Sequence, residues 1–150
     1  MGNRGNGSVA RYLYDLVLRW ADAAPEAPAL AAGRRTWSYS ELAEQARLVA
    51  AGLQAEGLHR RDRVAIYLDK RAETIVAMLG AAMAGAIFVP CNPVLKPPQV
   101  VHILRDSGAK GLVTSRSRLE ALLPDLRDLP VSRVIVTESP PEELAETATV

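Results

Sequence analysis

Three basic residues have the charge and the placement to attract an anion. Lys70 and Arg71 follow a predicted strand over residues 64–68, and Lys96 follows a predicted strand over residues 87–89. Ligands of open α/β sheets bind at the carboxyl ends of the strands, which is where these residues fall. Lys70 and Arg71 also open a predicted helix, where a cation opposes the helix dipole at a cost of about 0.3–1 kcal/mol each. We therefore hypothesise that this set, named here the basic edge, attracts an anionic group.

A plainer interpretation of the same residues is also open. Asp69 and Glu73 lie next to Lys70 and Arg71 in the sequence and could pair with them at a solvated rim. Exposed ion pairs of this kind form without any ligand and contribute less than about 1 kcal/mol. The sequence alone thus allows two interpretations of the basic edge, a ligand site and a charged rim.

The other residues that could do chemistry lack the partners which that chemistry requires. Cys91 has no base near it in the sequence and is expected to be a small buried packing residue. His102 is expected to be partly buried in a helix, and His59 to be solvated in an arginine-rich turn. Neither histidine has the spacing of a metal ligand. We predict no catalytic residue and no metal site in these 150 residues.

The elements that would position the basic edge alternate between strands and helices. The apolar run Val64–Leu68 predicts a strand buried on both faces. The pattern then predicts further elements in this order: a helix over 72–84, a strand over 87–89, a helix from Pro97 to near Gly108, a strand over 111–114, a helix over 117–123 and a strand over 134–136. This alternation predicts an α/β fold with a doubly wound, mostly parallel sheet and helices on both faces.

The first part of the chain has its own local signals. An apolar stripe predicts a helix through Val9, Leu13, Leu16 and Trp20. Residues 29–37 predict a hairpin around a glycine turn. Ser38 and Glu41 form a capping box that starts the next helix, and Gly57 suits its left-handed end.

The bulk composition narrows the class of protein. The chain is 49% hydrophobic and has a formal net charge of +1 with acids and bases interspersed, which argues against a nucleic-acid partner. A single cysteine excludes an internal disulfide and fits a reducing compartment. The amino terminus has no apolar signal sequence, and the apolar run over residues 75–89 is shorter than the roughly 20 residues of a membrane span. We expect a cytoplasmic protein without a membrane span.

Four segments resemble the shared blocks of one enzyme superfamily. They are residues 36–42 (TWSYSEL), 57–66 (GLHRRDRVAI), 84–93 (AGAIFVPCNP) and 103–109 (ILRDSGA). Their order and spacing are similar to those of the adenylate-forming superfamily, which holds acyl-CoA synthetases, luciferases and peptide adenylation domains. One departure is Arg61, which stands where the superfamily usually has glycine before the aspartate.

Over roughly residues 12–137, the chain thus resembles the N-terminal portion of an AMP-forming acyl-CoA ligase. Residues 67–74 and 92–97 are most similar to ligases associated with exosortase systems. The resemblance implies an incomplete N-terminal lobe of the ligase fold. It divides the chain into a flexible leader (1–8), the α/β lobe (9–137) and an acidic tail or the start of the remaining ligase (138–150).

The resemblance also implies a two-step reaction, in which a small carboxylate and ATP give an acyl-adenylate and a thiol then accepts the acyl group. The complete enzyme would use ATP, Mg²⁺ and either CoA or an acyl-carrier protein. The basic edge would then attract a CoA phosphate or the acidic face of a carrier. The superfamily's phosphate-binding loop and late catalytic lysine do not occur in these 150 residues, so we expect the chain alone to be inactive and to bind no cofactor.

The glycine pair Gly80 and Gly85 lies in and after an apolar helix, where glycine is expected to permit close packing of helix on sheet.

Two rival functions stand beside the ligase. The chain could be a stand-alone, non-catalytic module that binds a partner or carrier protein, or a small flavodoxin-like ligand-binding domain. In a ligase lobe, apolar helix faces and the sheet edge after residues 134–136 would meet the rest of the enzyme. We therefore expect the isolated chain to self-associate.

Overall fold

The computed structural model describes residues 10–137. The predicted leader and tail, as well as Val9, lie outside the described residues. The elements in chain order are α1 (Leu13–Ala23), β1 (Pro28–Ala32), β2 (Arg35–Ser38), α2 (Tyr39–Ala55), β3 (Arg63–Tyr67), α3 (Ala72–Met83), β4 (Ile87–Pro90), α4 (Pro97–Ser107), β5 (Gly111–Ser115), α5 (Arg116–Leu126) and β6 (Arg133–Thr137).

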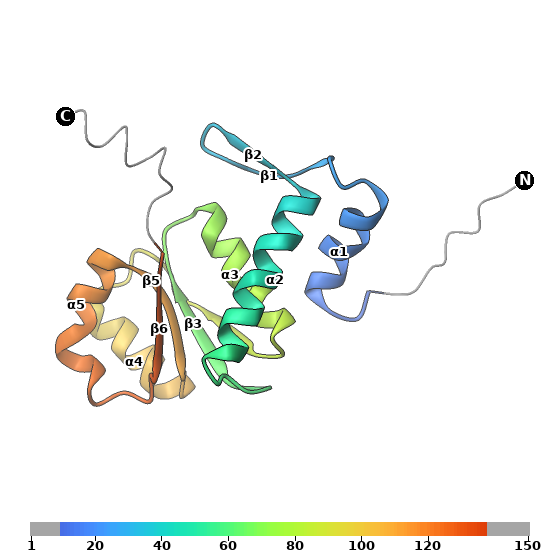
Figure 1. Cartoon of the computed structure of the whole chain (residues 1–150). Helices are drawn as coiled ribbons and strands as arrows, with labels where there is room; N and C mark the ends of the chain where they lie inside the picture. The colour runs from blue at the N-terminus through green and yellow to red at the C-terminus, as the bar shows by residue number, and fades with distance from the viewer. Residues whose placement is uncertain (1–9, 138–150) are drawn as a thin grey trace, which may run out of the picture.

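The main sheet is parallel and has the strand order β4-β3-β5-β6. The chain steps from β3 outward to β4, returns past β3 to β5, and continues to β6. Because crossovers between parallel strands are right-handed, this reversal places the connecting helices on both faces of the sheet. Figure 1 shows α2 and α3 on one face and α4 and α5 on the other. The predicted doubly wound α/β fold is confirmed.

Alternate residues of the central strands fill the two cores. Val64 and Ile66 of β3 face α2 and α3, where they pack with Leu53. Tyr67 faces the other side and packs with Leu104 of α4. Both faces of β3 are buried, as its continuous apolar sequence predicts. The strand therefore holds the two helical layers together and ends at the basic edge.

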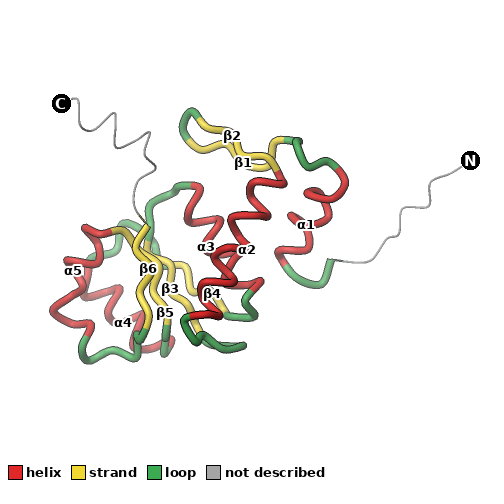
Figure 2. The backbone as a smooth tube through the Cα atoms, viewed as in Figure 1, coloured by secondary structure: helices red, strands yellow, loops and turns green. Residues whose placement is uncertain are grey.

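The amino-terminal elements form an outer layer against α2 and α3. Tyr14 and Val17 of α1 and Trp37 of β2 pack on a third apolar cluster around Leu42 and Leu79. The antiparallel β1–β2 hairpin stands apart from the main sheet, over the start of α2 (Figure 2). The predicted hairpin is confirmed.

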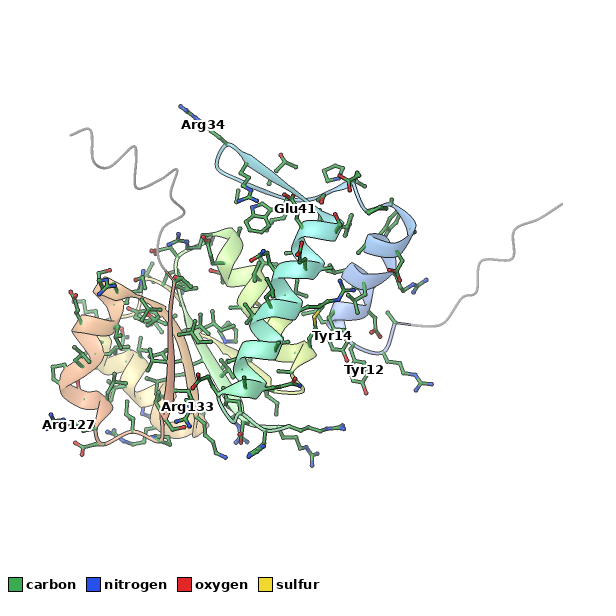
Figure 3. The ribbon with its side chains drawn as sticks, viewed as in Figure 1. Tyr12, Tyr14, Arg34, Glu41, Arg127 and Arg133 are labelled. Carbon is green, nitrogen blue, oxygen red and sulfur yellow. The ribbon has the colours of Figure 1, made fainter. Side chains whose placement is uncertain are left out.

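The capping box at the start of α2 forms as predicted. The backbone N–H of Glu41 donates to Ser38 Oγ at 3.2 Å, and the backbone N–H of Ser38 donates to Glu41 Oε2 at 2.8 Å. Figure 3 shows Glu41 at this end of the helix. Two N–H groups that the helix itself cannot satisfy thus find acceptors. This local signal fixes where α2 leaves the hairpin.

Gly80 serves a different contact from the predicted one. A Cβ atom at this position would lie 2.5 Å from Val49 Cγ1 and 3.0 Å from the carbonyl oxygen of Ala46, both in α2. The glycine therefore permits a close approach of α3 to α2, and the prediction that it serves helix–sheet packing is wrong. Because α3 is apolar nearly all round, its sequence does not tell which of its faces meets the sheet.

Arg61 explains why the superfamily favours glycine before the aspartate. Its φ of 71° is in the left-handed region, where a side chain is strained and glycine is not. Its backbone N–H donates to the carbonyl of Gly85 at 2.9 Å, which ties the turn before β3 to the end of α3. The turn thus keeps its shape although the residue that suits it has been replaced.

The helix after β5 is longer than predicted. The sequence predicts an end before Pro124, but α5 continues to Leu126. A proline removes one intrahelical hydrogen bond, and near the end of a helix few bonds remain to be lost. The added residues bring Leu126 against the core beneath α4, to which Leu122 also belongs. In the described part of the chain, no helix combines the length and the apolar character needed to cross a bilayer.

Candidate functional site

The basic edge lies at the carboxyl ends of two adjacent strands. Lys70 and Arg71 connect β3 to α3, and Lys96 immediately precedes α4 after the loop from β4. Because β3 and β4 are parallel neighbours, their ends fall at the same edge of the sheet. However, α3 and α4 lie on opposite faces, so Lys96 borders the edge from the other side (Figure 1). The structure thus places all three residues at one edge but on two helical layers.

The three residues differ in their surroundings. Arg71 pairs with Glu73, with 2.9 Å between Nε and Oε2, and the two side chains are 21% and 24% exposed. Lys70 and Lys96 are exposed, and the backbone N–H of Lys96 donates to Gln99 Oε1 at 2.9 Å. The pairing of Glu73 agrees with the charged-rim interpretation. The exposure of the two lysines leaves their ammonium groups accessible to an anion.

Asp69 pairs with an arginine that the sequence analysis did not consider. Arg118, in the first turn of α5, donates from Nη2 to Asp69 Oδ1 at 2.6 Å. It also donates from Nη1 to the carbonyl of Pro93 at 3.0 Å, and its guanidinium lies 4.3 Å from the ring centroid of Tyr67. One side chain from the β5–α5 junction therefore contacts the end of β3 and the loops after β3 and β4.

Tyr67 adds two hydrogen bonds to the contacts that Arg118 makes. Its hydroxyl donates to the carbonyl of Leu95 at 2.6 Å, and its own carbonyl accepts from Thr114 Oγ1 at 2.9 Å. The Tyr67 side chain is buried, so these bonds are sheltered from water. The reversal in strand order falls between β3 and β5, which is where doubly wound sheets bind their ligands. In this chain Arg118 and its partners occupy that position.

Only part of this network could be predicted from the sequence. Arg118 follows β5 at the same edge as Lys70, so its general position could have been inferred from the strand order. Its partners Asp69 and Pro93 are 49 and 25 residues away in the chain. No local pattern links residues at such separations.

Cys91 is a buried packing residue, as expected. It is 5% exposed, and burial raises the pKa of its thiol to about 11. At neutral pH almost none of it is the thiolate that acts as a nucleophile. His59 and His102 are both exposed. The expectation for His59 is confirmed, but that for His102 is wrong, because it lies on the solvent side of α4 while Val101 and Leu104 face the core.

The burial of Cys91 predicts low reactivity. A rise from 9.0 to about 11 reduces the thiolate at pH 8 about 100-fold, so iodoacetamide should modify the folded chain about 100-fold more slowly than the chain in urea. The rate of mass gain measures this directly. Equal rates in the two states would contradict the buried position.

A structural ion pair lies at the amino ends of the parallel strands, opposite the basic edge. Lys110 Nζ lies 2.7 Å from Asp62 Oδ1, and the backbone N–H of His59 donates to Asp62 Oδ2 at 2.9 Å. The hydrogen bond from Lys110, followed by that from His59, lowers the pKa of Asp62. These bonds join the turn before β3 to the start of β5.

The lowered pKa of Asp62 predicts a pH-dependent contribution to stability. Such a group stabilises the folded state above its unfolded pKa of about 3.9 and loses this effect as the pH falls through its folded pKa. Asp62→Asn should therefore lower the melting temperature more at pH 7 than at pH 2, which thermal unfolding of both proteins would measure. A difference of equal size at both pH values would show that the charge of Asp62 is not the cause.

Residues 10–137 offer no site for a metal by their own side chains. No group of three or more His, Cys, Asp or Glu side chains in this range comes together in a way that could hold an ion. The described residues thus bring together no carboxylate cluster for Mg²⁺, and no step of a nucleotide reaction is assigned to them.

Comparison with known sequences identifies one family. The family model described as AMP-binding enzyme matches residues 17–149. Surfactin synthase subunit 2 of Bacillus subtilis (strain 168) is 38% identical over 107 residues, which are 71% of this chain and 3% of that protein. Malformin synthetase mlfA of Aspergillus luchuensis (strain CBS 106.47) is 30% identical over 118 residues, 79% of this chain and 2% of that protein.

Solved structures superpose on most of this chain. A benzoate CoA ligase from Burkholderia xenovorans LB400 superposes with a TM-score of 0.78 at 25% identity, covering 86% of this chain and 26% of the ligase. The N-terminal domain of FACL13 from Mycobacterium tuberculosis superposes with a TM-score of 0.76 at 26% identity, covering 91% of this chain and 35% of that domain. The chain covers the N-terminal part of these ligases. It spans about a quarter to a third of the solved chains and a few per cent of the two sequence relatives.

Proposed function

The chain belongs to the AMP-binding enzyme family, and from this premise we propose that it forms the N-terminal lobe of a larger AMP-forming ligase. The complete enzyme would convert a carboxylate and ATP into an acyl-adenylate and pass the acyl group to a thiol. The observation that carries the proposal is the match with the family over residues 17–149, joined to the doubly wound sheet that superposes on the solved CoA ligase. The exosortase association stays a prediction.

Within that enzyme, the chain would act as scaffold and as one wall of the acceptor region. The complete enzyme would take ATP, Mg²⁺ and CoA or an acyl-carrier protein, and its place would be the cytoplasm. CoA is supported by the name of the benzoate CoA ligase that the chain resembles. The phosphate-binding loop and the catalytic lysine would come from other parts of the enzyme, because these 150 residues hold neither. The chain alone would therefore bind none of these cofactors.

The reaction products test this proposal. The complete protein, incubated with ATP, Mg²⁺ and a panel of carboxylates, should release AMP and pyrophosphate, and adding CoA should yield an acyl thioester. Formation of ADP and phosphate in place of AMP would contradict it. Chromatography separates the two nucleotides, so each outcome is unambiguous.

The basic edge is the proposed contact for the thiol acceptor. Lys70 and Lys96 are exposed beside the starts of α3 and α4, where an anion would be favoured by both the lysines and the helix dipoles. A CoA phosphate or the acidic face of a carrier has the required charge. The charged-rim interpretation predicts instead that these side chains do nothing beyond local pairing.

Alanine at all three positions of the basic edge separates these interpretations. In the complete enzyme, the triple variant should raise the KM for the thiol acceptor severalfold while adenylate formation keeps its rate. A matched control replaces three exposed arginines elsewhere on the lobe, namely Arg19, Arg47 and Arg127. Unchanged acceptor kinetics in the basic-edge variant would mean that these residues form only a charged rim and do not bind the acceptor.

The two rival functions gain no support. The match to the AMP-binding enzyme family over residues 17–149 and the superposition on a CoA ligase favour a ligase lobe over a stand-alone partner-binding module. A flavodoxin-like domain would bind its ligand between the ends of β3 and β5, where Arg118 and Tyr67 lie instead.

Self-association of the isolated chain remains a prediction of the proposal. Leu13, Leu16 and Trp20 of α1 are each about half exposed, and they line a groove of about 490 Å³ that also includes Ile75 of α3. In a larger ligase such a surface would be covered by other parts of the enzyme. Sedimentation velocity should therefore detect dimers or larger species of the isolated chain, and a sharp monomer at high concentration would contradict the expectation.

A further inference from the structure

We propose that Arg118 is a positioning residue that holds the loops after β3 and β4 as one unit and so fixes the basic edge. The inference rests on the proposed role of that edge in binding the thiol acceptor. Arg118 is not itself placed against the acceptor. It acts through the two loops that carry Lys70 and Lys96.

The geometry of Arg118 supports this role. Its guanidinium uses one Nη atom for the carboxylate of Asp69, the other for the carbonyl of Pro93, and its face for the ring of Tyr67. The side chain is only 18% exposed, so its orientation is set by protein contacts on several sides. A planar fork with several fixed donors makes such combinations, whereas a lysine offers a single point charge on a flexible stem.

The held residues are close in sequence to the two exposed lysines. Asp69 immediately precedes Lys70, so a fixed Asp69 restricts the backbone that presents Lys70. Lys96 follows Leu95, whose carbonyl accepts from the Tyr67 hydroxyl at 2.6 Å. Arg118 and Tyr67 therefore act on the two loops together, and each loop is held within three residues of its lysine.

Charge gives Arg118 a second effect on the basic edge. The side chain of Asp69 is 69% exposed although it pairs with Arg118. Without Arg118, this carboxylate would keep its charge next to Lys70 and would lose the guanidinium that lies 2.6 Å from it. It would then repel an anionic acceptor. Loss of Arg118 should thus weaken acceptor binding both by loosening the loops and by adding an unbalanced negative charge.

Hydrogen exchange of the complete protein tests the structural half of the proposal. Arg118→Ala should speed amide exchange about tenfold in residues 68–72 and 91–96, with little change elsewhere. Arg118→Lys should give an intermediate result. The matched control is Arg133→Ala, which removes an arginine bonded to the carbonyls of Glu56 and Ser132 at the other edge of the sheet (Figure 3). It should leave both loops unchanged.

Kinetics of the complete ligase test the functional half. Arg118→Ala should raise the KM for the thiol acceptor severalfold while the rate of adenylate formation is kept, and Arg118→Lys should restore part of the loss. If Arg118→Ala does not fold, Arg118→Lys and Tyr67→Phe, which removes only the bond to Leu95, carry the same test. Unchanged exchange in the two loops, or acceleration spread evenly over the lobe, would overturn the inference. So would loosened loops with an unchanged acceptor KM, whereas a protein that forms no AMP would count against the proposed function instead.

Discussion

Replacing Gly80 by alanine is expected to destabilise the lobe by about 2 kcal/mol, although alanine is the better helix former. The new Cβ atom would lie 2.5 and 2.6 Å from Val49 Cγ1 and Cβ, well inside van der Waals contact. Overpacking costs about 1–3 kcal/mol, and a clash with the Cβ of a branched side chain falls at the upper end, so about 2 kcal/mol remains after the roughly 1 kcal/mol that alanine gains in a helix. The helices α2 and α3 would have to move apart. Urea unfolding of both proteins measures the difference.

Gly52 provides a matched control for this prediction. It also lies within a helix, α2, but a Cβ atom there would meet nothing within 4 Å. Gly52→Ala should therefore stabilise the lobe by up to about 1 kcal/mol, the opposite sign. Adding Val49→Ala to Gly80→Ala removes the contacting side chain and should recover part of the loss. A Gly80→Ala variant more stable than the parent would show that the two helices do not approach closely here.

The second large effect is expected from Leu104→Ala. Leu104 is 0% exposed and belongs to the core beneath α4 and α5, together with Tyr67 and Leu122. Truncating a fully buried leucine loses its transfer free energy and leaves a cavity, at a cost of about 2–5 kcal/mol. The same core supports the helix that carries Arg118. The variant should thus shift the urea midpoint strongly.

An exposed leucine gives the comparison for Leu104. Leu123→Ala removes the same atoms from a side chain of α5 that is 54% exposed, and it should change the stability by no more than about 0.5 kcal/mol. Similar losses in the two variants would mean that the layer of α4 and α5 is not packed on the sheet as described.

The elements that the sequence predicts correctly depend on local patterns. Ser38 and Glu41 are three residues apart, so the start of α2 could be inferred from them alone. Gly57 takes a φ of 81° after α2, as expected for a left-handed helix end. The apolar run of β3 likewise predicts burial on both faces. The resembling segments lie at such junctions, and for this reason the fold and the family were predictable.

The features that the sequence did not reveal depend on contacts between distant residues. Gly80 faces Val49, 31 positions earlier in the chain, and an apolar helix gives no sign of which neighbour its glycine meets. Arg118 reaches Asp69 and Pro93 across the sheet. The candidate site was therefore predicted as three basic residues, without the arginine that holds their loops together.

ATP–pyrophosphate exchange reports adenylate formation before any thiol takes part, and so it tests whether this lobe serves a larger ligase. The exchange should be measured with the complete protein and with the chain of 150 residues, each with the same carboxylates and Mg²⁺. We expect carboxylate-dependent exchange by the complete protein and none above background by the chain alone. Exchange by the chain alone would contradict the proposal, because the residues that adenylate the substrate would then lie within this lobe.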